Sequence, residues 1–418
     1  MLRKFDIAVI GGGPAGIMAA LTAKNKENKK SICLIEASER ICKKLRITGG
    51  GRCNFTNNKD ISCFFDNIVN NEKFMYSSLY TFTNEDTKKF IKSIGLDYIV
   101  EKENDDKVYL KSGNALDLID RLEYELKKAD IEIFLNSKVK NIKIEEGTKS
   151  VYTESELFQC DKLIIATGGK SYPQTGSDGE MLKIVKKLGY NIVSPVSALS
   201  PIEIKEKWIN NIPGISICDV DIQIYNGKHK KARPIKIIRG DIIFTHKGIG
   251  GPAALKASSY INRELENAYI SIDFLASTDT EELYEIAKSY PKKSVLNNIR
   301  GILPNNFVKC ILEEAQRQSE RNFDFINENS SNMSKKDYEV LATLIKSCKL
   351  NPKKLCSIDK ATVTSGGVSV SEIDSSTMES KKHKGVFFAG EIIDVDALTG
   401  GYNLQIAFST GYISGIST

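Results

Sequence analysis

The order of short apolar runs and turns at the start of the chain is typical of parallel α/β proteins. Residues 5–10 are mostly apolar and predict a strand that is buried on both faces of a sheet. A glycine-rich turn follows, and a helix is predicted to begin near Pro14. Residues 31–35 form a second apolar run that leads directly into Glu36. The pattern predicts a strand, a turn, a helix and a second strand parallel to the first.

The turn carries the spacing G-x-G-x-x-G, which is typical of dinucleotide-binding folds. Gly11 permits the tight turn, Gly13 lets the backbone approach a pyrophosphate, and Gly16 allows the helix to pack closely. The helix N-terminus then faces the phosphates. An acid at Glu36, twenty residues after Gly16, suits a ribose diol. The predicted cofactor-binding residues of this segment are Gly11, Gly13, Pro14, Ala15, Gly16 and Glu36.

A second glycine-rich loop follows where a protein that binds only NAD would show further βαβ units. Three successive glycines at 49–51 exclude a core element, and they allow backbone N–H groups to approach a ligand. Arg52 and Asn54 supply hydrogen-bond donors at the end of the loop. Such a loop suits a flavin ring or its pyrophosphate. The predicted cofactor-binding residues here are Lys44, Thr48, Gly49, Gly50, Gly51, Arg52, Cys53 and Asn54.

A third motif follows a predicted antiparallel meander. Residues 139–144, 150–154 and 157–160 predict the meander, and a buried strand at 163–165 then ends in Ala-Thr-Gly-Gly. Many buried strands end in Thr-Gly, but this position after a meander is typical of flavoproteins with two dinucleotide sites. The predicted cofactor-binding residues here are Val139, Ala166, Thr167, Gly168 and Gly169.

The C-terminal segment completes the set. Residues 385–391 predict a strand that ends in a glycine and an acid, where a carboxylate can hold the ribityl hydroxyls of a flavin. An amphipathic helix then opens at 400–403. Its N–H groups and positive dipole end suit the negative charge at the N1 and C2 carbonyl of a reduced flavin. The predicted cofactor-binding residues here are Gly390, Glu391, Gly400, Gly401, Tyr402, Asn403 and Leu404.

These motifs, together with residues 170–173, 244–246 and 248–252, resemble the BaiN-like (YhiN-type) flavoproteins over essentially the whole chain. The resemblance implies an FAD-binding oxidoreductase of the glutathione-reductase structural class. We therefore expect an α/β fold, in which a discontinuous Rossmann-like FAD-binding domain carries an inserted β-rich plus helical domain. Some members of the family are NAD(P)H-dependent reductases of carbon–carbon double bonds conjugated to a ketone, and others are assigned as amine oxidases.

Both ends of the chain carry flavin motifs, so the residues between them form an insertion. Residues 1–190 and 357–418 are predicted to build the FAD-binding domain. Residues 191–275 contain prolines and alternating runs that predict a β-rich domain. Residues 276–356 predict a helical domain and the return of the chain, with the first helix capped at Thr278.

The insertion contains a segment that imitates a second nucleotide fingerprint. Residues 248–253 have the spacing G-x-G-x-x-A after a predicted strand, and Asp273 lies twenty residues after Ala253 at the end of another. One interpretation is a nicotinamide-nucleotide site that begins at Gly248. The other is a helix cap at a domain hinge, facing the flavin, because the β-rich insertion is too short for a full second Rossmann domain.

His246 and Tyr402 are the predicted catalytic residues. His246 is expected where a strand meets a glycine turn, so it can donate a proton at the flavin or cap its own turn. Tyr402 can protonate a carbanion or cover the flavin ring, whereas packing is favoured for Tyr172. Asp394 and Asp396 precede the last helix and suit either a ribityl or substrate contact, or a solvated turn.

Composition adds several expectations. Nine scattered cysteines without a C-x-x-C pair, and only three histidines, predict reduced structural thiols and no metal site. Cys53 has no second thiol shortly after the glycine loop, which argues against thiol redox catalysis. The start of the chain leads straight into a strand and no apolar stretch reaches about 18 residues, which predicts a soluble cytoplasmic protein without membrane contact.

The net charge of +6 is modest for 418 residues and does not demand a nucleic-acid partner. One dense basic cluster is more typical of a solvated hairpin edge than of an anion site. Its members are Lys228, Lys230, Lys231, Arg233, Lys236 and Arg239.

The combined features predict hydride delivery from NAD(P)H to FAD and then from flavin N5 to an electrophilic carbon of a small enone-type substrate. A side-chain acid completes the addition, in a cleft between the flavin domain and the insertion. A flavin-dependent amine oxidase is the alternative within enzymes. A flavoprotein that modifies nucleic acid, such as tRNA, is the alternative of another class, and the single basic run disfavours it. The oligomeric state stays open.

Overall fold

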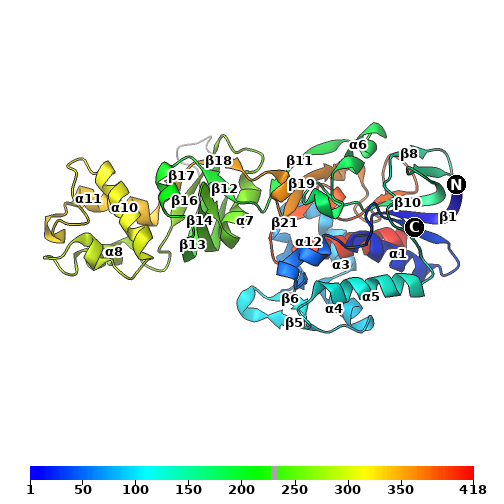
Figure 1. Cartoon of the computed structure of the whole chain (residues 1–418), viewed down its shortest axis with the longest axis horizontal. Coiled ribbons are helices and arrows are strands. Elements are labelled where there is room, and N and C mark those ends of the chain that lie inside the picture. The colour runs from blue at the N-terminus through cyan, green and yellow to red at the C-terminus, as the bar shows by residue number, and fades with distance from the viewer. Residues whose placement is uncertain (227–232) are drawn as a thin grey trace. The chain divides into compact units, whose positions relative to one another are not determined.

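The computed structural model describes residues 1–226 and 233–418. It contains two compact units, which are described separately (Figure 1). Unit 1 consists of residues 1–196 and 358–418, and unit 2 of residues 197–357. Three residues of the predicted basic cluster lie outside the described part of the chain: Lys228, Lys230 and Lys231.

Unit 1 is built on a seven-stranded sheet with the order β7-β2-β1-β10-β9-β8, in which β20 also pairs with β10. Strands β7, β2, β1, β10 and β20 are parallel, and β8 and β9 form the predicted antiparallel meander. The runs predicted at 157–160 and 163–165 belong to one strand, β10. Its first half pairs with β9 and its second half with β20. The strands are β1 (Leu2–Ile10), β2 (Ile32–Ile35), β7 (Glu132–Phe134), β8 (Asn141–Ile144), β9 (Lys149–Tyr152), β10 (Leu157–Ile165) and β20 (Val386–Phe388).

Both faces of this sheet are covered, because successive side chains of β1 enter different cores. Ile7 and Val9 belong to one hydrophobic cluster, and Ala8 and Ile10 belong to another. Helices α1 and α5 contribute to the first cluster, α6 to the second and α12 to both. The result is the predicted α/β architecture with a Rossmann-like core. The helices are α1 (Pro14–Lys26), α5 (Ala115–Lys128), α6 (Glu180–Lys187) and α12 (Tyr402–Ser417).

The last helix of unit 1 packs closely against the first. A Cβ atom on Gly411 would lie well within 3.0 Å of the Ala15 carbonyl oxygen, and one on Gly415 would lie equally close to that of Ala19. Real Cβ atoms do not approach so closely, so glycine is required at both positions. This contact places α12 beside the helix that begins at the first glycine turn.

Smaller elements surround this core. Strands β3, β6 and β5 form a separate sheet, and the pairs β4–β21 and β11–β19 link distant segments. These elements are β3 (Asn54–Asn57), β4 (Ile68–Asn70), β5 (Tyr98–Glu101), β6 (Lys107–Leu110), β11 (Ile192–Ala198), β19 (Val363–Val368), β21 (Asp396–Ala397), α2 (Ser62–Phe65), α3 (Tyr76–Thr81) and α4 (Asn84–Ser93).

Unit 2 contains a seven-stranded antiparallel sheet with the order β17-β16-β13-β14-β15-β12-β18. Its two edge strands, β17 and β18, are separated only by Asn351, so the sheet curls until its edges meet. The residues of the predicted β-rich and helical parts share one hydrophobic core. The elements are β12 (Ile202–Ile204), β13 (Ser216–Asn226), β14 (Lys236–Thr245), β15 (Gly248–Gly250), β16 (Ala268–Asp273), β17 (Cys348–Leu350), β18 (Pro352–Leu355), α7 (Gly251–Ile261), α8 (Thr280–Lys288), α9 (Val295–Asn298), α10 (Asn305–Gln318) and α11 (Lys335–Lys346).

The cap predicted at Thr278 is wrong by one residue. Asp279 is the N-cap of α8, and its carboxylate accepts a hydrogen bond from the Glu282 N–H at 2.7 Å. Thr278 and Asp279 are neighbours before the helix, and both residue types are favoured as N-caps. Asp279 is the one that caps the helix.

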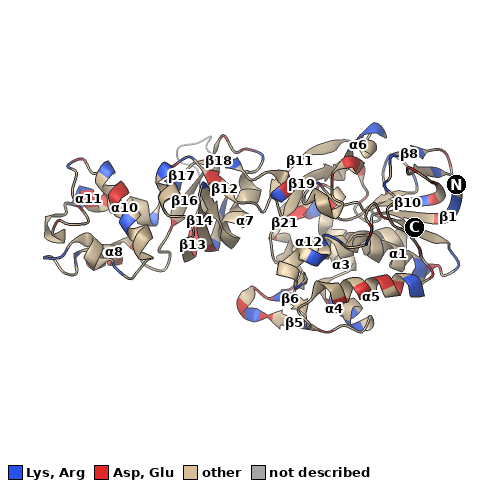
Figure 2. Ribbon diagram, in the orientation of Figure 1, with Lys and Arg blue, Asp and Glu red and all other residues tan. Residues whose placement is uncertain are grey.

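Charged residues of both signs are interspersed along the ribbons of each unit (Figure 2). Within the described residues, the structure has no helix that combines the length and the apolar character needed to cross a membrane.

Candidate flavin site

The first glycine turn leaves space at one position only. A Cβ on Gly11, which has a φ of +106°, would clash with the Ala166 carbonyl, and one on Gly16 would clash with the Gly11 carbonyl. At Gly13 an added Cβ would meet nothing within 4 Å. Gly11 and Gly16 are therefore explained by packing within the protein, and Gly13 keeps the backbone accessible from outside. Pro14 begins α1 directly behind it, so the first N–H groups of the helix adjoin this space.

Glu36 lies at the end of β2 with its carboxylate against the same turn. Its Oε2 accepts a hydrogen bond from the Gly12 N–H at 2.7 Å, and its Oε1 accepts one from the Ser38 N–H at 2.8 Å. These bonds fix the position of the carboxylate. Its predicted contact with a ribose diol stays a prediction.

The second glycine loop has a backbone that favours glycine. Gly49, Gly50 and Gly51 have φ values of +57°, +67° and +89°. An added Cβ at Gly50 would meet nothing within 4 Å, so this part of the loop is open. Thr48, which precedes the glycines, donates its hydroxyl to the Leu45 carbonyl at 2.7 Å.

The polar side chains that follow the loop bind protein groups. The Arg52 guanidinium pairs with Glu101 and lies 4.1 Å from the centre of the Tyr109 ring. Asn54 Nδ2 donates to the carbonyl oxygens of Thr56 and Val108, both at 3.0 Å. The donors predicted here for a ligand therefore have protein partners in this structure.

Four segments that are distant in sequence meet around Glu391. Lys44 Nζ lies 2.8 Å from Glu391 Oε2 and donates to Ser171 Oγ at 2.6 Å. Ser171 Oγ donates to Glu391 Oε1 at 3.2 Å, and the Thr364 N–H donates to the same oxygen at 2.8 Å. We call these four residues the Glu391 cluster. The side chains of Lys44 and Glu391 are 24% and 23% exposed, so a ligand can still reach them.

Sequence reasoning missed Ser171 and Thr364 as members of this cluster. Thr364 Oγ1 accepts from the N–H groups of Lys170 and Ser171 at 2.8 and 3.0 Å. Thr364 lies on β19, a strand whose residues are all buried. Gly366 and Gly367 on the same strand have φ values of +109° and +155°. Two adjacent glycines in the run Val363–Val368 were the available signal, because glycine inside a strand marks a close approach.

The N-terminus of α12 is held tightly. Its N-cap is Gly401, with a φ of +92°, and Tyr402 is 1% exposed with its ring edge-on to Phe64 at 4.9 Å between centroids. Burial raises the pKa of Tyr402 well above its usual value. Its hydroxyl has no hydrogen-bond partner among the described residues. Asn403 exchanges two hydrogen bonds with the backbone of Ala397, at 2.7 and 2.9 Å, and so fixes the approach to the helix.

Asp394 and Asp396 are buried beside two asparagines, which excludes the solvated-turn interpretation. Asp394 Oδ2 accepts from Asn71 Nδ2 at 3.1 Å, and Asp396 Oδ1 accepts from Asn70 Nδ2 at 2.7 Å. Tyr172 has a positive φ of 54° and precedes a short 3-10 turn.

The segment that imitates a second fingerprint consists of strand β15, which pairs with β12 and β14, and the start of helix α7 in unit 2. Gly248 lies in β15, where an added Cβ would clash with the Ile202 carbonyl of β12. The glycine therefore serves a strand contact and not a phosphate. Asp273 pairs with Lys346 at 2.8 Å and caps the Leu275 N–H at 2.9 Å. The structure thus disfavours a nicotinamide-nucleotide site there.

His246 lies exposed in the turn between β14 and β15. The side chain that hydrogen-bonds within this turn is that of Thr245, whose Oγ1 accepts from the Lys247 N–H at 3.4 Å. Among the residues that the structure describes, no hydrogen bond supports the interpretation of His246 as the cap of its own turn.

The structure offers a direct test of whether these residues suit FAD. Thr167 follows the end of β10 beside Gly11, and its Oγ1 is buried without a hydrogen-bond partner in the described part of the chain. An orphaned hydroxyl at a turn is a place where a ligand oxygen completes the bonding. With the open space at Gly13 and the Glu391 cluster, the donor set fits a flavin dinucleotide.

Comparison with known proteins decides the family. The model of the family described as "HI0933-like protein Rossmann domain" matches residues 5–417. The chain belongs to the HI0933-like family. This confirms the predicted resemblance to the BaiN-like (YhiN-type) proteins and identifies the chain as a flavoprotein oxidoreductase.

Three curated relatives cover almost the full HI0933-like chain. A "3-dehydro-bile acid delta(4,6)-reductase" of Clostridium scindens is 28% identical over 98% of this chain and 98% of its own. A "Ribosomal RNA dihydrouridine synthase" of Haemophilus influenzae is 30% identical over 98% of this chain and 97% of its own. A protein of the same name from Escherichia coli is 28% identical over 98% and 97%.

Solved structures share the fold of this HI0933-like protein. The open conformation of a flavocytochrome c3 fumarate reductase aligns with a TM-score of 0.50 at 15% identity, over 99% of this chain and 78% of that one. A 3-ketosteroid delta1-dehydrogenase from Sterolibacterium denitrificans aligns with a TM-score of 0.50 at 12% identity, over 99% of both chains.

Proposed function

We propose that this chain reduces a carbon–carbon double bond conjugated to a carbonyl group, with FAD as the bound carrier and NAD(P)H as the electron donor. The observation that carries the proposal is the shared chemistry of its full-length relatives. One is named for reducing double bonds of a 3-oxo bile acid, and the others for forming dihydrouridine, the product of saturating the uracil C5=C6 bond. In both reactions a hydride adds to the far carbon of a double bond conjugated to a carbonyl, and a proton adds to the other carbon of that bond.

The residues of unit 1 suit particular parts of FAD, which when bound and reduced would supply a hydride from N5. The N–H groups behind Gly13 suit the pyrophosphate, and Glu36 suits the adenosine ribose. Lys44 and Ser171 present donors and Glu391 an acceptor, the combination that ribityl hydroxyls need.

Tyr402 is our proposed proton donor. Its raised pKa keeps the hydroxyl protonated at neutral pH, so it suits an acid and not a base. In a Tyr402→Phe variant, NAD(P)H should reduce the flavin at the normal rate, and reoxidation by the enone should be slower by about a hundredfold. Equal rates for both half-reactions in the variant and the parent would remove Tyr402 from this role, and His246→Gln is the next variant to measure.

Anaerobic stopped-flow spectroscopy tests the proposal directly. Flavin absorbance near 450 nm is followed after mixing with NADH or NADPH. We expect fast bleaching by one of them, and recovery of the colour on adding a conjugated enone. Bleaching by neither donor would contradict the reductase, and bleaching by an amine followed by recovery with oxygen would support an oxidase instead.

A uracil base in ribosomal RNA is a second candidate substrate, favoured by the names of the H. influenzae and E. coli relatives. The charge of the chain favours neither substrate class, since the net charge is +6 but there is no long basic run beyond the one cluster. Incubating the NAD(P)H-reduced enzyme with unmodified ribosomal RNA and measuring dihydrouridine by mass spectrometry distinguishes the substrates. Turnover of a 3-oxo steroid enone without RNA modification would favour the small-molecule class.

A further inference from the structure

A buried network of polar side chains lies at the start of α12. Gln405 is at its centre and has no exposed surface. Its Oε1 accepts hydrogen bonds from Thr56 Oγ1 at 2.7 Å and Thr87 Oγ1 at 2.8 Å. Its Nε2 donates to the Phe82 carbonyl at 3.2 Å and to Ser409 Oγ at 3.0 Å. All four hydrogen-bonding positions of the amide are therefore filled.

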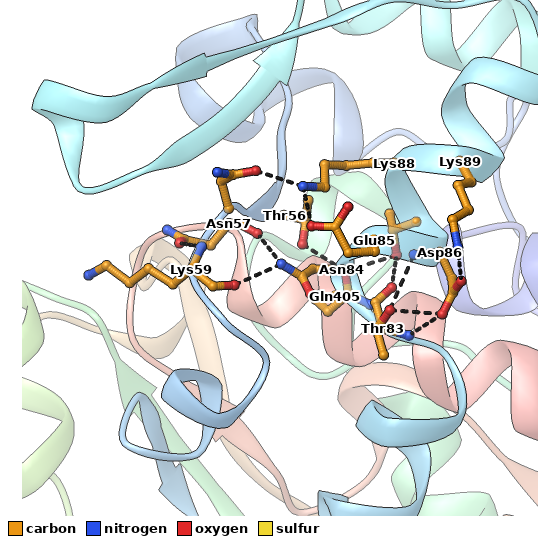
Figure 3. Close-up of polar contacts among 12 residues, drawn as sticks. Thr56, Asn57, Lys59, Thr83, Asn84, Glu85, Asp86, Lys88, Lys89 and Gln405 are labelled. Atoms are coloured by element: carbon orange, nitrogen blue, oxygen red, sulfur yellow. Dashed lines mark hydrogen bonds and ion pairs between the residues drawn. The ribbon is translucent and has the colours of Figure 1, made fainter.

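The network joins three elements of unit 1 (Figure 3). Thr56 lies on β3, Thr87 on α4 and Gln405 on α12. Asn84, at the start of α4, donates its amide to the Asn57 carbonyl of β3 at 2.8 Å. Every side chain of the network is at most 2% exposed, so water does not replace its hydrogen bonds; the five are those of Gln405, Thr56, Thr87, Ser409 and Asn84.

Strand β3 also connects the second glycine loop to the first turn of α12. Asn54, which follows the loop, donates its amide to the Thr56 carbonyl at 3.0 Å. A Cβ on Gly401 would clash with that same carbonyl, so the two backbones touch there. Asn57 Nδ2 donates to the Gly400 carbonyl at 3.2 Å. The loop and the helix N-terminus are therefore held by one strand.

An apolar core would not fix the helix in this way. Where α12 packs against α1, through Gly411 and Gly415, close packing sets the distance between the two helices. Hydrogen bonds have narrow distance and angle requirements, so the amide of Gln405 also fixes the position of the helix along its axis. Burying five polar side chains costs desolvation that apolar side chains would avoid, and fixing one arrangement is the best-attested use of such groups.

We propose that Gln405, Thr56 and Thr87 are positioning residues that hold the N-terminus of α12 against the second glycine loop, and that they thereby set the affinity and the reduction potential of the bound flavin. This inference rests on the proposed function, because it takes FAD as the ligand of both segments. The field of a helix terminus falls off within its first turn. A small displacement of α12 therefore changes how strongly negative charge on the reduced pyrimidine end is stabilised.

The experiment compares variants that keep the shape of the side chain. Thr56→Val and Gln405→Met remove the hydrogen bonds, and Thr56→Ser keeps the hydroxyl. Ser414→Ala is the control, because Ser414 is a buried serine of α12 that hydrogen-bonds to the Phe388 and Thr410 carbonyls, outside the network. For each protein we would measure the melting temperature, the dissociation constant of FAD from the apoprotein, and the flavin midpoint potential against a reference dye.

We expect Thr56→Val and Gln405→Met to weaken FAD binding about tenfold, which corresponds to about 1.4 kcal/mol. We expect both to shift the midpoint potential of the bound flavin to more negative values, and Thr56→Ser to restore both properties. Ser414→Ala should lower the melting temperature without changing the potential.

Two outcomes overturn the inference, and each has a different meaning. If the parent protein binds FAD and the variants lose only melting temperature, the network is structural and the positioning role is wrong. If the parent protein itself binds no FAD, the proposed function fails together with the inference. Reduction potentials that shift as expected in a protein that reduces no enone would uphold the positioning role and reject the substrate class alone.

Discussion

Lys43 and Lys44 are neighbours in sequence but have different surroundings. Lys43 Nζ lies 3.1 Å from Glu39, whose side chain is 62% exposed. Lys44 Nζ instead joins Glu391 and Ser171 in a half-buried cluster. Exposed ion pairs contribute little because water and salt screen them, whereas charge-assisted bonds in a half-buried cluster are stronger. The two lysines are therefore a matched pair for testing the site.

Replacing Lys44 by methionine should weaken FAD binding about tenfold, because the Glu391 carboxylate loses its cation and, in the proposed binding mode, the ribityl chain loses a donor. Lys43→Met should leave the affinity unchanged. Titration of apoprotein with FAD, followed by flavin fluorescence, measures both. Equal affinities for the two variants would show that the Glu391 cluster does not bind the cofactor.

The thiol of Cys53 should be inert in the folded protein. Cys53 has no exposed surface, and burial raises its pKa to about 12, so little thiolate exists near pH 8. Cys218 is exposed. We expect iodoacetamide to label Cys218 in the native protein and to reach Cys53 only after unfolding, as peptide mass spectrometry can determine. Rapid labelling of native Cys53 would reopen the thiol redox mechanism.

At the scale of elements, the contact between α1 and α12 brings the two ends of unit 1 together. Helix α1 begins at the first glycine turn, and α12 begins after Gly400 and Gly401. Both Gly411 and Gly415 lie against the α1 backbone. Glycine lowers the intrinsic stability of a helix, so its presence at two such positions reflects the contact and not propensity.

Gly411→Val should therefore lower the free energy of unfolding by at least about 1–3 kcal/mol, through overpacking against α1. Ser417→Ala, at the partly exposed end of the same helix, is the control and should change stability little. Urea denaturation of the two variants and the parent measures the difference. An unchanged midpoint in Gly411→Val would mean that the helices can separate without cost.

The sequence predicted the elements whose signals are local. The first turn, Glu36 at the end of β2, the meander and the last helix are each encoded within a few successive residues. Contacts between distant segments had no such signal, so the partners of Glu391 on β19 and the Gln405 network were missed. The interpretation of the segment near Gly248 as a nucleotide site is disfavoured for the same reason. The strand that crowds that glycine, β12, lies far from it in sequence.

At the scale of the whole molecule, the two units differ in how the chain builds them. Unit 2 is continuous, from 197 to 357, and has its own hydrophobic core. Unit 1 is assembled from 1–196 and 358–418, and β20 and α12 of the second segment complete its sheet and its cores. Only unit 2 therefore has all of its core residues in one stretch of chain.

A fragment of residues 197–357 should fold alone, because it retains the whole sheet and the helices packed on it. We expect cooperative thermal unfolding by circular dichroism. A fragment of residues 1–196 should show no cooperative transition, because it lacks β20 and α12. Cooperative unfolding of that fragment would show that the first segment is stable without the second.

This division has a consequence during synthesis. At about 5–20 residues per second, the ribosome needs on the order of ten seconds or more to make the residues that follow position 196. Unit 2 can collapse during that interval. Strand β10 still lacks its partner β20, and the apolar surface of α1 still lacks α12. The first 196 residues are thus the part of the nascent chain that most needs a chaperone until the last helix emerges.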